Sequence, residues 1–87
     1  MELKELRNQI DTIDDELVRM FAKRMALSAQ VADYKKAHNM PIYVPSREQD
    51  ILDSIDTKVA PEIAPYTKEL YCKIFELSRC YQSEQKL

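Results

Sequence analysis

The stretch LKELRNQIDTIDDELVRMFAKRMALSAQVADYKKAH, residues 3–38, decides the fold. Its apolar side chains recur in alternating steps of three and four residues, which is the heptad pattern of one long helix with a continuous seam. Neither Pro nor Gly interrupts the pattern before Pro41. We therefore predict a helix from about residue 3 to residue 38. The seam consists of Leu3, Leu6, Ile10, Ile13, Leu17, Met20, Leu27, Val31 and Tyr34, with Arg24 in one seam position.

Two shorter helices are expected after this one, which makes the predicted fold all-α. The second spans about 45–57, and two starts are open for it: Pro45 in its first turn, or Ser46 as the cap of a capping box with Gln49. The third begins at about 62 or 66, near Pro61 and Pro65, and ends at about 84. We expect one domain over residues 1–87, without repeats.

The length of the first helix predicts a dimer. About 36 helical residues span about 54 Å, whereas a compact chain of this length has a diameter of only about 30 Å. The seam is nevertheless apolar to both ends. A second copy of the chain is the simplest cover for the excess, so we predict an intertwined homodimer of three-helix chains. The alternative is an isolated long hairpin with a frayed end.

Composition excludes several classes of protein. The chain contains no Gly, so it cannot form a Gly-rich phosphate loop. A formal net charge of −2 argues against a globally basic nucleic-acid binder. No apolar run reaches membrane-spanning length and the first residues do not resemble a signal peptide, so we expect a cytoplasmic protein without a membrane partner.

Cysteine and histidine content predicts no metal site and no cofactor. Cys72 and Cys80 lie eight residues apart in one helical segment, about 12 Å along its axis, which is too far for a disulfide between them. His38 is the only histidine. Two reduced, partly buried thiols are the expected state.

The most informative residues are polar side chains on faces that should be apolar. Lys35 follows Arg24 by three turns, so the two share a face about 16 Å apart and could clamp an anion between them. Each of these polar residues, taken alone, has a structural explanation. Arg24 could set the register of the helix pairing, Glu48 could pair with Arg24, and a buried Ser could bond back to its own helix. Together they are costly unless they enclose a polar ligand. The set is Arg24, Ser28, Lys35, Glu48, Ser78 and Gln82.

In five ordered blocks the sequence resembles the all-helical class of chorismate mutases. The opening LRNQIDTIDDEL, residues 6–17, is similar to the family pattern L-R-x-x-I-D-x-I-D-x-x-L. No single block is decisive, but the ordered set is specific and covers nearly the whole chain. The other blocks are AKRM around Arg24, VADYK ending at Lys35, PIYVPSRE over 41–48 and SRCYQ over 78–82.

The resemblance implies a role for seven residues in the rearrangement of chorismate to prephenate. Arg7, Arg24 and Arg47 would serve the substrate carboxylates or organise the groups that do. Lys35 and Gln82 would contact the ether oxygen, Glu48 the ring hydroxyl, and Ser78 the ring-carboxylate end. The chain departs from the pattern at Tyr43 and Val44, where some members carry Arg and Asp. One carboxylate contact and one hydroxyl contact are therefore expected to be missing or replaced.

These residue types suit a reaction that needs orientation and charge stabilisation. Arg holds carboxylates through two parallel hydrogen bonds, which would select the reactive conformer of the substrate. The ammonium of Lys35 and the amide of Gln82 would stabilise negative charge on the ether oxygen in the transition state. Arg7 lies 17 residues before Arg24 in the sequence, about 25 Å along one helix, so we expect it to act in the partner's site.

Two other functions remain open from the sequence. An isochorismate-pyruvate lyase of the same fold needs the same cationic clamp, although Glu48 favours the mutase. A non-catalytic helical dimerisation module needs neither Arg24 nor Lys35 and would gain stability from apolar residues at both positions.

Overall fold

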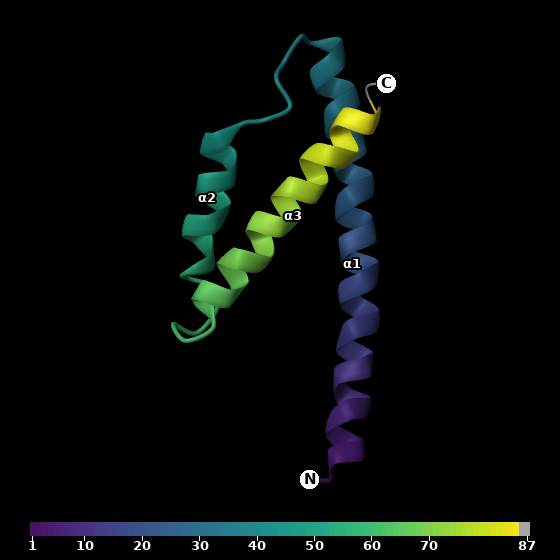
Figure 1. Cartoon of the computed structure of the whole chain (residues 1–87), viewed down its shortest axis with the longest axis vertical. Helices are drawn as coiled ribbons and strands as arrows, with labels where there is room; N and C mark the ends of the chain where they lie inside the picture. Colours follow the sequence, from purple (N-terminus) through teal and green to yellow (C-terminus); the bar gives the residue numbers. More distant parts are fainter. Residues whose placement is uncertain (86–87) are drawn as a thin grey trace.

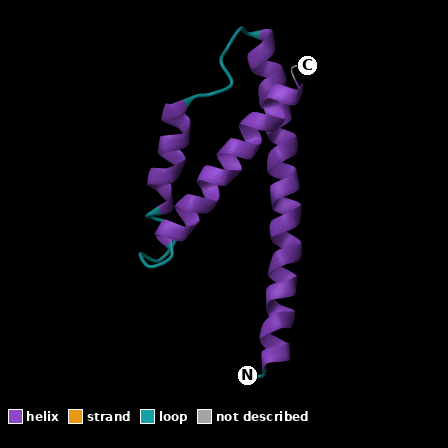
Figure 2. Cartoon of the chain, in the orientation of Figure 1, coloured by secondary structure: helices purple, strands orange, loops and turns teal. Residues whose placement is uncertain are grey.

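The structure is a computed structural model that describes residues 1–85, and within them it contains three helices and no strand (Figures 1 and 2). Helix α1 spans Leu3–Ala37, α2 spans Pro45–Ile55 and α3 spans Ala64–Gln85. The all-α prediction is confirmed. Within the described residues, no helix is long and apolar enough to cross a membrane.

Helix α1 ends in a turn that normally uses glycine. Asn39 adopts a positive φ of 55°, the left-handed conformation that Asn tolerates better than most residues. The N–H of Met40 donates to the carbonyl of Lys35, and the N–H of Asn39 donates to that of Lys36. These two bonds form a Schellman motif, which satisfies carbonyls at the helix end. A chain without Gly thus uses Asn39 in the turn that terminates its longest helix, Leu3–Ala37.

The structure decides between the two expected starts of α2. Pro45 occupies the first turn and Val44 is the N-cap, without a side-chain capping bond. Pro is favoured there because its missing N–H would have no helical partner and its φ is already helical. The capping box of Ser46 and Gln49 does not form, since the amide of Gln49 donates to Asp53 instead.

Helix α3 packs against both other helices, whereas α1 and α2 do not pack directly against each other in the described part of the chain. The apolar residues that become buried are few: Ala32 on α1, Ile55 on α2, and Ala64 and Phe75 on α3. Such a small set supplies little hydrophobic stabilisation for one chain. Cys72 and Cys80 are free, as expected, but they are exposed rather than partly buried.

The chain is far more elongated than a globule of its length. Its radius of gyration is 16.0 Å and its longest dimension is 54 Å, against about 12 Å expected for the radius of gyration of a compact domain. The N-terminal half of α1 extends away from the other helices (Figure 1). The seam side chains from Leu3 to Met20 are accordingly 44% to 59% exposed. A continuous apolar face of this kind is typical of an interaction surface.

Candidate active site

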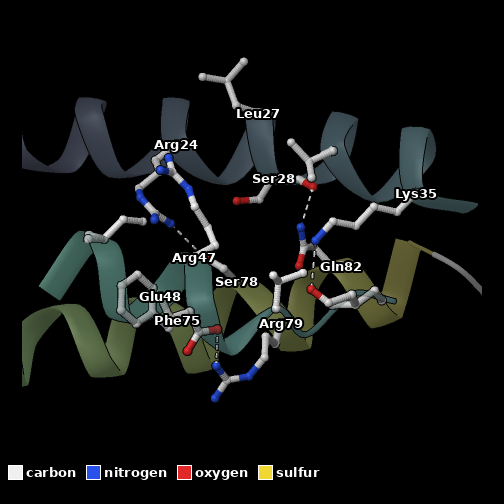
Figure 3. Close-up of a pocket in the computed structure, with 14 residues that line it drawn as sticks. Arg24, Leu27, Ser28, Lys35, Arg47, Glu48, Phe75, Ser78, Arg79 and Gln82 are labelled. Atoms are coloured by element: carbon white, nitrogen blue, oxygen red, sulfur yellow. Dashed lines mark hydrogen bonds and ion pairs between the residues drawn. The ribbon is translucent and has the colours of Figure 1, made fainter. Parts of the chain in front are cut away.

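A cavity of about 300 Å³ opens between the C-terminal half of α1, the 38–44 loop, the start of α2 and the end of α3. It exists because α3 contacts both other helices while these remain apart. Arg24, Ser28 and Lys35 extend from α1 toward the side on which α2 and α3 lie (Figure 3). The cavity therefore collects polar residues from three separate parts of the sequence.

Six of the seven predicted site residues line this cavity: Arg24, Lys35, Arg47, Glu48, Ser78 and Gln82. Arg7 does not. It is exposed on the part of α1 that extends away from the body of the chain. The six belong to all three helices, so the fold brings together residues up to 58 positions apart, from Arg24 to Gln82.

Arg24 is held in place by helix α3. Its Nη1 atom donates to the Ser78 hydroxyl at 3.0 Å, and its guanidinium carbon lies 5.9 Å from the ring centre of Tyr71 and 5.8 Å from that of Phe75. Ser78 thus serves Arg24 and, among the described residues, does not bond back to its own helix. A guanidinium has five N–H donors, so Arg24 keeps further donors for an anion.

Lys35 and Gln82 are each oriented by a backbone carbonyl. The Lys35 ammonium donates to the carbonyl of Ile42 at 2.9 Å, which connects α1 to the loop before α2. The Gln82 amide nitrogen donates to the carbonyl of Ser28 at 3.1 Å. An ammonium carries three N–H donors and an amide nitrogen two. Both side chains therefore retain donors, and each has one bond that restricts its position.

Glu48 pairs with a residue that the sequence did not single out. Its Oε2 atom accepts a hydrogen bond from Nη1 of Arg79, so the structural alternative in which Glu48 pairs with Arg24 does not hold. The hydrogen bond to Glu48 raises the pKa of the Arg79 guanidinium above its ordinary value, because it stabilises the charged form. Arg79 could have been identified as a cavity residue from its position three residues before Gln82, which places both on the same face of α3.

The two positions that depart from the family pattern have different surroundings. Val44 lines the cavity and offers it only an apolar surface. The ring of Tyr43 lies 4.7 Å from the guanidinium carbon of Arg79, a cation–π contact. Glu48 is consequently the only acidic residue among those that line the cavity, beside Arg24, Lys35, Arg47 and Arg79.

A cavity with four basic residues and one acidic residue suits a ligand with more than one negative charge. Guanidinium and ammonium groups at its ends can hold two carboxylates, and the remaining N–H donors of Lys35 and Gln82 can stabilise an oxygen between them. Within residues 1–85, no group of three or more His, Cys, Asp or Glu side chains could hold a metal ion.

Comparison with known proteins agrees with this chemistry. Residues 6–83 match the family described as chorismate mutase type II. The chain is 34% identical over 90 residues, 99% of its length, to a bifunctional chorismate mutase/prephenate dehydratase of Aquifex aeolicus. It is 48% identical over 52 residues, 60% of its length, to a T-protein of Haemophilus influenzae, and 40% identical over 53 residues, 61% of its length, to a chorismate mutase of Methanocaldococcus jannaschii.

The share of each relative's own length that this chain matches differs. The matched part is 25% of the Aquifex protein, 14% of the Haemophilus protein and 54% of the Methanocaldococcus protein. The chain thus spans about a quarter of the length of the Aquifex relative. The family match itself covers most of this sequence and includes all seven predicted site residues. This chain belongs to the chorismate mutase type II family.

Proposed function

We propose that this protein converts chorismate to prephenate in the biosynthesis of phenylalanine and tyrosine. The observation that carries the proposal is the placement of Arg24, Lys35, Arg47 and Gln82 around one cavity of about 300 Å³. That volume lies at the lower end of the range for small-molecule sites. The substrate has two carboxylates and an ether oxygen, which are the groups that these side chains can bind.

The reaction is an intramolecular rearrangement, in which one C–O bond breaks while one C–C bond forms. Arg24 and Arg47 bind carboxylates and hold the enolpyruvyl arm over the ring, so the reacting carbons meet. Ser78 stands at the ring-carboxylate end and Glu48 accepts a hydrogen bond from the ring hydroxyl. No nucleophile takes part, and the residues act by orientation and by charge.

Lys35 and Gln82 stabilise the transition state. As the C–O bond breaks, the ether oxygen gains negative charge, and an ammonium and an amide N–H bind that oxygen more strongly than in the ground state. The bonds to the carbonyls of Ile42 and Ser28 already restrict both side chains. This preorganisation lowers the cost of aligning them during the reaction.

The active form in this proposal is a homodimer in which Arg7 completes the partner's site. Three observations support it: the seam from Leu3 to Met20 is exposed, the N-terminal half of α1 extends alone (Figure 1), and Arg7 is absent from the cavity of its own chain. Antiparallel pairing of two α1 helices would cover both seams. It would also bring Arg7 of one chain toward Arg24 of the other.

Purified protein tests the proposal directly. We expect chorismate to disappear and prephenate to form well above the uncatalysed rate, with isochorismate cleaved to pyruvate much more slowly. Lys35→Ala and Gln82→Ala should each lower kcat by a hundredfold or more, about 3 kcal/mol. The matched controls Lys36→Ala and Gln30→Ala change exposed residues outside the cavity on α1 and should leave kcat unchanged. Absence of prephenate above background would refute the proposal.

A further inference from the structure

Arg79 lines the cavity and is bound on two sides. Its guanidinium donates to the Glu48 carboxylate on α2, and its carbon Cζ lies 4.7 Å from the ring centre of Tyr43 in the loop before α2. The side chain of Arg79 is 34% exposed and that of Glu48 is 22% exposed, so solvent weakens the ion pair only in part. Arg79 is therefore fixed between a carboxylate and an aromatic ring.

This arrangement limits what Arg79 itself can do. One face of its guanidinium is covered by Tyr43, and one of its N–H groups is taken by Glu48. Arg24 and Arg47, in contrast, line the cavity without an ion pair to Glu48 among the described residues. The two arginines that remain available for an anionic ligand are thus distinct from Arg79.

Glu48 has two alternative uses within the same cavity. Its carboxylate could turn toward Arg24 or Arg47 and neutralise a group that should bind a substrate carboxylate. Alternatively, it could face the cavity as a hydrogen-bond acceptor. A charge-assisted bond from Arg79 to one oxygen holds the carboxylate on the α3 side, and the other oxygen has no hydrogen bond from the part of the chain that the structure describes.

We propose that Arg79 is a positioning residue, which holds Glu48 as the acceptor for the ring hydroxyl and keeps it from pairing with Arg24 and Arg47. Tyr43 supports it by packing on the guanidinium. This inference rests on the proposed function, because it assigns Glu48 to the substrate of that reaction. It also gives a role to Tyr43, one of the two positions that depart from the family pattern.

The inference predicts which kinetic constant changes. The ring hydroxyl does not react, so its contact with Glu48 exists in both the ground state and the transition state. Loss of such a uniform contact raises KM and leaves kcat nearly unchanged. We expect Arg79→Met to raise KM about tenfold, which is about 1.4 kcal/mol, with kcat within twofold. Arg79→Lys keeps the charge and should recover part of the loss.

A double-mutant cycle with Glu48→Gln separates positioning from other roles. The Glu48→Gln substitution removes the carboxylate that Arg79 holds, so Arg79→Met in that background should change KM by less than twofold. Tyr43→Leu should raise KM about threefold in the wild-type background and have no effect in Glu48→Gln. Lys73→Met is the matched control, since Lys73 pairs with Glu76 on the exposed side of the same helix; its KM should equal that of wild type.

The outcomes distinguish this inference from the proposed function. If wild type and Lys73→Met do not convert chorismate, the proposed function is wrong. If they do, and Arg79→Met changes KM equally in both backgrounds, the positioning role is refuted. A lowered melting temperature with unchanged KM would likewise refute it, since that result assigns Arg79 to stability alone. Should Arg79→Met fail to fold, Arg79→Lys and Tyr43→Leu provide the same cycle.

Discussion

Mixing two inactive variants tests the shared site directly. Arg24 lines the cavity, whereas Arg7 lies 17 residues earlier on α1, about 25 Å along the helix axis. No small dicarboxylate reaches both residues within one chain. We expect Arg7→Ala and Arg24→Ala to be nearly inactive alone, at or below about 1% of wild type, because each removes a charged donor to the substrate.

The recovery after mixing follows from the geometry of the proposed dimer. If the subunits exchange at random, half the dimers contain one chain of each variant. In such a dimer, one site takes Arg24 from the Arg7→Ala chain and Arg7 from the other chain, so it is complete. The second site lacks both arginines. Activity should therefore recover to about one quarter of wild type.

A matched mixture controls for any loss of activity that mixing itself causes, and native mass spectrometry controls for exchange. Lys4 is exposed on α1, one turn before Arg7, and Lys4→Ala alone should be fully active. Its mixture with Arg24→Ala should reach about one half of wild type, since every site built on an intact Arg24 works. Native mass spectrometry reports the fraction of mixed dimers. If mixed dimers form but the Arg7→Ala and Arg24→Ala mixture stays inactive, the shared site must be abandoned.

The proposed donor, the proposed interface and the independence from metal can each be tested separately. Gln82→Glu replaces the amide donor by a carboxyl group, which can donate to the ether oxygen only when it is protonated. Its kcat should therefore increase as the pH falls while that of wild type changes little, and a flat profile would contradict the role of the Gln82 donor. Ile13→Glu puts a charge on the exposed seam at both copies of the proposed interface, and sedimentation should show one chain instead of two, with activity lost. Excess chelator should leave kcat unchanged, and any loss that added metal restores would contradict a reaction carried by side chains alone.

The sequence was sufficient to predict the helices because each depends on local pattern. A heptad seam without Pro or Gly predicted 3–38, and α1 spans Leu3–Ala37. Pro45 marked the start of α2, although the sequence alone did not distinguish it from the Ser46 cap. For α3, the proposed starts at 62 or 66 lie on either side of the observed Ala64. Helix ends are harder to predict than helices themselves, because neighbouring residues can each serve as the first residue or the cap.

The cavity could be predicted only in part, because pairing across helices is a property of tertiary structure. The pattern of polar residues on apolar faces identified six residues, and all of them line the cavity: Arg24, Ser28, Lys35, Glu48, Ser78 and Gln82. The sequence did not predict which side chains these residues bind. Several basic side chains could have paired with Glu48. The packing of α3 against α2 determines that its partner is Arg79.

Hydrogen bonds within the chain explain how so many polar side chains can be placed around one small cavity. Arg24 bonds to Ser78, Gln82 to the carbonyl of Ser28, and Lys35 to the carbonyl of Ile42. No buried side-chain nitrogen or oxygen lacks a partner among the described residues. Contacts within the chain thus largely avoid the desolvation penalty that unpaired groups would carry. Because each donor group uses only one of its N–H bonds, a dianion can bind without breaking this network, and the same contacts that stabilise the cavity orient its donors for the proposed reaction.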